Sequence, residues 1–149
     1  MIHTKKRKVY IIFSGIALLT VMITIFCLSA QNGQASSETS GWVVDLLTKL
    51  FGSMPDESVI RTLAHFCEFA GLGFVMSNFI FALKDKPKPL LCILLSWGYA
   101  WTDEIHQIFV PQRAFQLIDL TVDLGGIVLG TLVYVFLNFL INKRKNKIH

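Results

Sequence analysis

Four long apolar runs dominate the chain and are separated by short polar segments. They cover residues 9–28, 62–83, 90–110 and 117–141. A helix needs about 20 residues to cross the hydrocarbon core of a bilayer, and each run reaches that length. Because lipid offers no hydrogen bonds to backbone groups, each run is expected to be helical. The pattern predicts an all-α fold, a four-transmembrane-helix bundle, in a single domain over residues 1–149.

The first run follows four basic residues and could be taken for a secretory signal peptide. Its apolar stretch is longer than the roughly 7–15 residues of a signal core, and three further runs follow it. We therefore interpret it as a retained first span.

Positive charge is placed unevenly along the chain. Eleven of the 14 Lys and Arg residues precede the first run, separate the second from the third, or follow the fourth. In a four-span chain these three positions share one side of the membrane, and Lys and Arg favour the cytoplasmic side. Both termini are therefore predicted to be cytoplasmic. The net charge of +4 then needs no nucleic-acid partner, and membrane lipids are the expected surroundings.

The long connection between the first two runs starts with a Ser/Gln/Gly-rich loop. Ser40 and Gly52 are then typical of the start and end of a short helix, with Trp42 on its apolar face. A short amphipathic extracytoplasmic helix is expected here, lying on the outer leaflet or packed on the bundle.

Ionisable side chains inside the spans are costly to bury and commonly mark a functional site. At about 1.5 Å per residue, Glu68, Asp103 and Asp123 each lie roughly 9–10 Å from the outer end of their helix. Helical spacing also places neighbouring polar residues on the same faces. The predicted polar cluster at the outer rim comprises Arg61, His65, Glu68, Asp103, Glu104, His106, Gln107, Arg113, Asp119 and Asp123.

Small residues continue one of these polar faces. Gly126 and Gly130 follow Asp119 and Asp123 at four-residue or near four-residue intervals, a pattern that permits close helix contact. The two aspartates are therefore expected to point into the bundle. The three cysteines, Cys27, Cys67 and Cys92, have no metal-ligand spacing and are expected to be buried apolar side chains.

Three interpretations of the polar cluster remain open. It is a network that fixes helix register, with Arg61 or Arg113 paired to an acid; a site for an extracytoplasmic ligand or lipid headgroup; or a catalytic or metal centre. The metal candidates are His65, Glu68, Asp103 and His106, because carboxylate–His pairs one turn apart occur in di-metal bundles. The reversed order of the His65 pair and competition from water argue against this, so no metal and no cofactor are predicted. Acid–base catalysis by the same four side chains is chemically possible.

Several segments resemble the VanZ-like family of membrane proteins. The stretch from Arg61 to Phe69 is similar to the family's Arg-Lys-x-x-His-x-x-Glu-Tyr segment, with Thr62 where lysine is common. Residues 102–113 resemble the Thr-Asp-Glu-x-His-Gln-x-Phe-x-Pro-Gly-Arg signature, with Gln112 where glycine is common. Asp119-x-x-x-Asp123-x-x-Gly126 and Ser29-Ala30-Gln31 match two further family stretches.

The resemblance implies a multi-pass protein of the bacterial plasma membrane. The family's namesake is associated with low-level teicoplanin resistance, so we expect a non-enzymatic binding or accessory factor that contributes to glycopeptide resistance. The partner of this chain at the outer face would be a lipoglycopeptide or a cell-wall precursor, and its oligomeric state is left open. The alternative is a membrane-embedded enzyme that acts on a lipid-linked or cell-wall substrate by acid–base or metal chemistry. A small proton-coupled transporter is disfavoured, because no acid lies in the cytoplasmic half of the spans.

Overall fold

The computed structural model describes residues 2–31, 48–49, 57–111 and 113–145, and these contain four long helices and no strand. The helices are α1 (Ile2–Ser29), α4 (Glu57–Lys84), α5 (Pro89–Gln107) and α6 (Leu117–Lys145). Each overlaps one of the four apolar runs, so the all-α prediction is confirmed for this part of the chain. The amphipathic helix expected between Ser40 and Gly52 lies outside the described residues, apart from two helical positions at 48–49.

Three of these helices are long and apolar enough to cross a bilayer: Lys5–Ser29, Val59–Lys84 and Leu117–Arg144. Side-chain exposure is reversed relative to a water-soluble protein. Phe13 is 67% exposed, whereas the Asp123 carboxylate is 0% exposed. Exposed apolar groups are stable against lipid and buried acids are stable inside a polar network, so both features indicate a membrane protein. Helix α5 is shorter, with 19 residues, and its last turns are acidic, so a fourth span stays a prediction.

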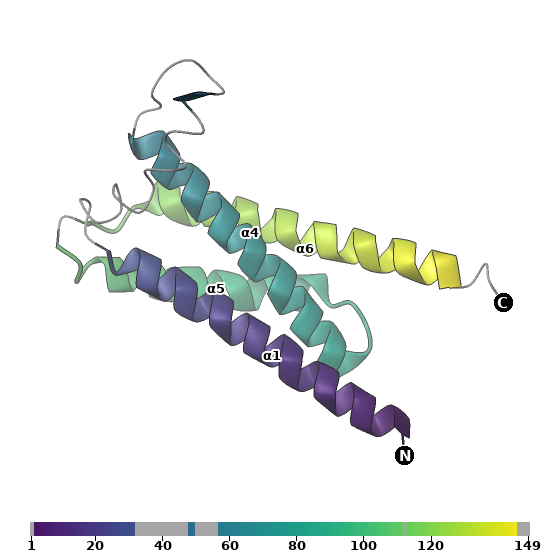
Figure 1. The fold of residues 1–149 in the computed structure, drawn as a ribbon. Coiled ribbons are helices and arrows are strands. Elements are labelled where there is room, and N and C mark those ends of the chain that lie inside the picture. The colour runs from purple at the N-terminus through teal and green to yellow at the C-terminus, as the bar shows by residue number, and fades with distance from the viewer. Residues whose placement is uncertain (1, 32–47, 50–56, 112, 146–149) are drawn as a thin grey trace.

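Helix α4 is central and packs against α1, α5 and α6. Figure 1 shows that the last turn of α1, the first turn of α4, the last turn of α5 and the first turn of α6 lie at one end of the bundle. We call this the polar end. The start of α1, the α4–α5 connection and the end of α6 lie at the opposite end, which we call the basic end.

Glycine allows α4 and α6 to approach closely. A Cβ atom at Gly126 would overlap the carbonyl oxygen of Phe66, and one at Gly130 would overlap that of Ala70. On α4, a Cβ at Gly73 would likewise overlap the backbone of Ile127. The predicted small-residue strip on α6 therefore forms the α4–α6 contact, which also orients Asp123 and Asp119, one and two turns earlier on α6.

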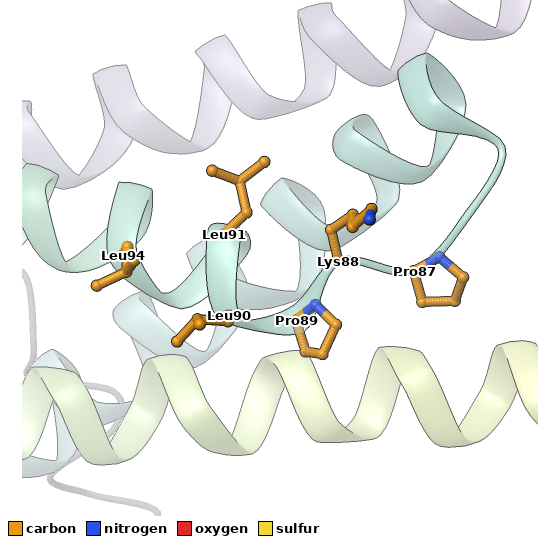
Figure 2. A pocket seen from close by; sticks show the side chains of 6 residues that line it. All are labelled: Pro87, Lys88, Pro89, Leu90, Leu91 and Leu94. Atoms are coloured by element: carbon orange, nitrogen blue, oxygen red, sulfur yellow. The ribbon is translucent and has the colours of Figure 1, made fainter.

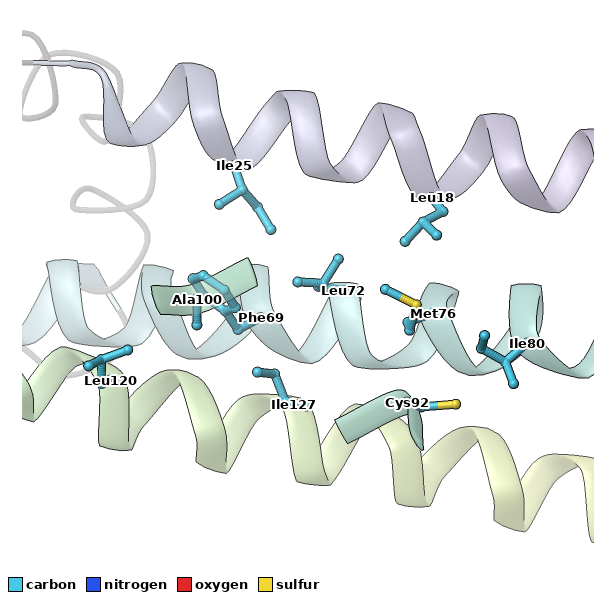
Figure 3. Packing of buried hydrophobic residues seen from close by; sticks show 10 residues of the cluster. All are labelled: Leu18, Ile25, Phe69, Leu72, Met76, Ile80, Cys92, Ala100, Leu120 and Ile127. Carbon is cyan, nitrogen blue, oxygen red and sulfur yellow. The ribbon is translucent and has the colours of Figure 1, made fainter. Parts of the chain in front are cut away.

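The apolar core fills the space between these helices along their length. Figure 3 shows Leu18 and Ile25 of α1 pointing toward Leu72 of α4, with Ile127 of α6 on the other side of α4. Of the three cysteines, Cys92 belongs to this core, but Cys27 and Cys67 are exposed. The expectation that all three are buried is wrong for these two, because a side chain that faces lipid needs no cover from protein.

The basic end is held by contacts between α1 and the end of α4. The Arg7 guanidinium donates to the carbonyl oxygen of Leu83 at 3.0 Å and lies 3.4 Å from the exposed carboxylate of Asp85. Tyr10 donates from its hydroxyl to Oδ1 of Asn78 at 2.5 Å. Asp85 has a φ of 57°, a left-handed conformation that Asp and Asn tolerate better than most residues. These contacts fix the α4–α5 turn far from the polar end.

Candidate functional site

The polar end brings the predicted site residues together from three helices and from the connection before α6. Arg61, His65 and Glu68 come from α4, and Asp119 and Asp123 come from α6. The others lie on α5, at Asp103, Glu104, His106 and Gln107, and in the following connection, at Arg113. Six of these ten residues are buried, which is unusual for polar side chains and requires that they bind one another, water or a ligand.

Two contacts join α4 to α6 one turn apart. Nη2 of Arg61 donates to Oδ2 of Asp119 at 2.5 Å, which confirms one of the predicted pairings. One turn deeper, Nδ1 of His65 lies 3.1 Å from Oδ1 of Asp123, and both side chains are buried. Because an ionised carboxylate only accepts hydrogen bonds, His65 is the donor. The glycine contact of α6 with α4 follows directly, so the two pairs and the close packing share one helix face.

A third contact attaches α1 and α5 to the cluster. Oγ of Ser29, the last residue of α1, donates to Oδ2 of Asp103 at 2.7 Å. The same oxygen accepts a hydrogen bond from Nε2 of Gln107 at 3.2 Å. The sequence interpretation did not include Ser29 in the site, although the Ser29-Ala30-Gln31 stretch carried the signal. Ser29 therefore belongs to the scaffold that holds Asp103.

Glu104 fixes the connection that leads into α6. Its Oε2 accepts a hydrogen bond from the backbone N–H of Gln116 at 2.9 Å, and its side chain is buried. Gln116 was also missing from the predicted site, because a backbone donor leaves no mark in the residue types. This contact holds the chain just before Asp119, so it helps to place the first turn of α6.

Three half-buried residues of the cluster are left without a side-chain hydrogen bond or ion pair to the described part of the chain: Glu68, His106 and Arg113. The imidazole ring of His106 stacks on Phe26 with the ring centroids 4.3 Å apart. These residues provide a carboxylate, an imidazole and a guanidinium whose polar atoms make no side-chain hydrogen bond within the described ranges. We call them the unpaired triad.

The charge of Arg113 is coupled to the rest of the cluster. Burial, and then the like charge of Arg61, lower the pKa of the Arg113 guanidinium, while Asp119, Asp103 and Glu68 oppose this change. A guanidinium stays protonated in proteins, so Arg113 remains a cation. The charges of Asp119, Asp103 and Glu68 each favour the charged form of the guanidinium.

Several buried atoms also have no partner among the described residues. Four are oxygens: Oδ1 of Asp103, Oε1 of Glu104, Oε1 of Gln107 and Oδ2 of Asp123. The other two at this end are Nδ1 of His106 and Nε of Arg113. Buried polar atoms are almost always hydrogen-bonded in folded proteins. The cluster therefore has unused capacity, mostly for accepting hydrogen bonds, that water or a polar ligand would satisfy.

Three of the four metal candidates, His65, Asp103 and His106, have separate partners, and Glu68 belongs to the unpaired triad. His65 contacts Asp123, Asp103 contacts Ser29 and Gln107, and His106 stacks on Phe26. Within the described residues, no group of three or more His, Cys, Asp and Glu side chains is arranged to hold a metal ion.

A separate pocket of about 430 Å³ lies at the basic end, around the start of α5. Figure 2 shows its lining by Pro87, Lys88, Pro89, Leu90, Leu91 and Leu94. At about 1.5 Å per residue, Leu90 is roughly 20 Å along α5 from Asp103, so the pocket is not part of the polar cluster. Its lining is apolar apart from Lys88 and offers no catalytic group.

The comparison with known families agrees with this architecture. The family model described as VanZ/LLP1 matches residues 14–138 of the 149-residue chain, a range that contains all ten predicted site residues. No curated protein and no solved structure gives a significant match.

Proposed function

Since the chain belongs to the VanZ/LLP1 family and has helices built to cross a bilayer, we propose that it is a four-span protein of the bacterial plasma membrane with both termini in the cytoplasm. The basic residues at the start of α1, in the α4–α5 connection and at the end of α6 support this orientation, because all three segments lie at the basic end. The polar end then faces the exterior, and α5 is the fourth span.

Labelling of single cysteines in a cysteine-free variant tests this orientation. A membrane-impermeant maleimide should modify Asp45→Cys in whole cells and should modify Lys86→Cys only after the cells are lysed. Labelling of Lys86→Cys in intact cells would place the basic end outside and contradict the proposal.

The function that this arrangement supports best is non-enzymatic binding at the outer face. We infer that the polar end binds a polar group of a membrane-associated molecule and thereby lowers the access of a teicoplanin-type glycopeptide to its target. The unpaired triad is the observation that carries this inference. Arg61 pairs with Asp119 and His65 with Asp123, whereas Glu68, His106 and Arg113 have no such partner among the residues that the structure describes. A network that served only to fix helix register would have no need of three unused polar groups.

Antibiotic susceptibility after gene deletion and re-expression tests the function. The wild-type chain should restore the lost teicoplanin resistance, and Glu68→Gln should fail to restore it, because the amide keeps the shape of the side chain but removes its charge. Asp85→Asn is the matched control: it makes the same carboxylate-to-amide change at the basic end, in a turn whose left-handed backbone Asn tolerates. Equal membrane levels of both variants must be shown by immunoblot. Full resistance with Glu68→Gln would refute a role for the site.

One observation favours an enzyme as the second candidate. An imidazole held by a carboxylate, as His65 is by Asp123, is an arrangement used in acid–base catalysis. An enzyme of this kind would act on a lipid-linked or cell-wall substrate at the outer face. Lipid and cell-wall precursor profiles that change on expression of the wild-type chain, and not of His65→Gln, would support this candidate. Unchanged profiles would favour binding without chemistry.

A further inference from the structure

The charge balance of the polar end restricts the kind of ligand that it can bind. Carboxylates outnumber guanidinium groups by five to two in the cluster: Glu68, Asp103, Glu104, Asp119 and Asp123 against Arg61 and Arg113. With all five carboxylates ionised and both imidazoles protonated, the acids retain an excess of one negative charge. Uncompensated negative charge is costly away from water, so buried acids either bind protons or lie beside a cation, and a positively charged ligand group would serve in the second way. A purely anionic ligand would increase the imbalance.

The hydrogen-bonding atoms without partners independently favour a ligand with a positively charged donor group. Asp103 is 2% exposed and Gln107 is 0% exposed, yet Oδ1 of the first and Oε1 of the second have no partner among the described residues. The two residues are one turn apart on α5 and are already joined through Nε2 of Gln107, which fixes both side chains. Both unused atoms are acceptors. A primary ammonium group has three donors and matches them, whereas a trimethylammonium group has none.

The unpaired guanidinium of Arg113 favours an anionic group in the same ligand. Arg113 has no side-chain partner in the described part of the chain, its Nε is buried, and its charge interacts with those of Asp103 and Glu68. A guanidinium binds phosphate oxygens through paired N–H groups. Acceptors for a cation and a donor for an anion therefore lie within one site. A ligand that carries both charges a few bonds apart would satisfy both.

We propose that the polar end binds a zwitterionic headgroup that contains a primary ammonium and a phosphate, as in an ethanolamine phospholipid. Glu68, Asp103 and Gln107 receive the ammonium group, and Arg113 binds the phosphate. This assignment rests on the proposed function of the polar end as a ligand site, and it names the chemistry of the ligand. The polar end lies beside exposed apolar helix faces, which favours a lipid as the source of the headgroup, although free phosphoethanolamine carries the same groups.

Lipid binding by the purified full-length chain tests the proposal. Native mass spectrometry from detergent micelles would compare dioleoyl lipids with ethanolamine, choline and glycerol headgroups. We expect the wild-type chain to bind the ethanolamine lipid about tenfold more tightly than the choline lipid, the difference expected from hydrogen bonds to a charged group. Glu68→Gln should reduce this preference, and Arg113→Gln should weaken binding of both lipids. Asp85→Asn should behave like the wild type. The second arm adds soluble phosphoethanolamine as a competitor of the ethanolamine lipid. Displacement of the lipid shows that the headgroup alone suffices, and retention of the lipid shows that the acyl chains are also needed.

Equal affinity of the wild-type chain for the ethanolamine and choline lipids would overturn the proposal, as would tightest binding of the anionic glycerol lipid. This comparison uses only the wild-type chain and does not depend on whether a variant folds. It also separates the two proposals. Loss of resistance with Glu68→Gln but no ethanolamine preference would refute the ammonium ligand and leave the binding function intact. An ethanolamine preference with unchanged resistance would refute the role in resistance alone.

Discussion

Replacing Gly130 by alanine tests whether close contact between α4 and α6 holds the bundle together. An added methyl group would overlap the carbonyl oxygen of Ala70 and lie 3.0 Å from the backbone nitrogen of Phe74. Backbone atoms in a packed helix cannot move aside as a flexible side chain can, so the two helices must separate. Overpacking of this kind costs about 1–3 kcal/mol.

Gly71→Ala is the matched control, because it makes the same substitution on a helix where nothing lies within 4 Å of the new Cβ. Alanine gains about 1 kcal/mol of helix propensity over glycine at either position, so this gain cancels when the two variants are compared. The remaining difference is the cost of the contact, and Gly130→Ala should be less stable than Gly71→Ala by about 1–3 kcal/mol.

Unfolding of purified protein in mixed detergent micelles, followed by circular dichroism, measures both free energies. Two variants of equal stability would refute the inference that α4 and α6 meet backbone to backbone at this position. Separation of the helices would also lengthen the 3.1 Å contact of His65 with Asp123.

Two other predictions follow from contacts of α1 and from the exposure of the cysteines. Ser29→Ala removes the donor to Asp103 and should lower the free energy of unfolding by about 1.5–3 kcal/mol, as expected for a hydrogen bond to a charged group. Thr24→Ala loses only a hydrogen bond within α1 and should lower this free energy less. Equal losses in the two variants would show that the Ser29 contact does not join the helices. A small lipid-soluble maleimide should modify Cys27 and Cys67 faster than the buried Cys92 in the folded protein, as measured by mass spectrometry, and the opposite order would contradict the packing of α1 and α4.

The sequence alone predicts the helices well because length and hydropathy decide what can cross a bilayer. It also anticipates the packing role of Gly126 and Gly130, since this depends on spacing within one helix. The pairing of Arg61 with an acid is anticipated only as one of several options, because Asp119 lies on a different helix. The third apolar run extends to residue 110, three residues beyond the end of α5. The helix stops at Gln107, and the residues before Pro111 turn instead, because proline disfavours a helical conformation in the residue that precedes it.

Contacts between helices were harder to predict. Ser29 and Asp103 are 74 positions apart, and nothing in the residue types specifies that one donates to the other. His65 contacts Asp123 because of how α4 is rotated against α6, and that rotation is set by glycine packing further along the helices. Hydropathy also fails to separate the core from the lipid-facing surface, as Cys67 shows, because both environments accept the same apolar side chains.

The short turn between α4 and α5 limits how the protein could change shape. Four residues separate Lys84 from Pro89, and the backbone of Pro87 has little freedom about φ. A chain of that length spans at most roughly 3.3–3.6 Å per residue, so the two helix ends that it joins must stay neighbours. Any separation of α4 from α5 that admits a ligand would therefore pivot about this turn. The displacement would be greatest at the polar end, where Ser29 of α1 donates a hydrogen bond to Asp103 of α5.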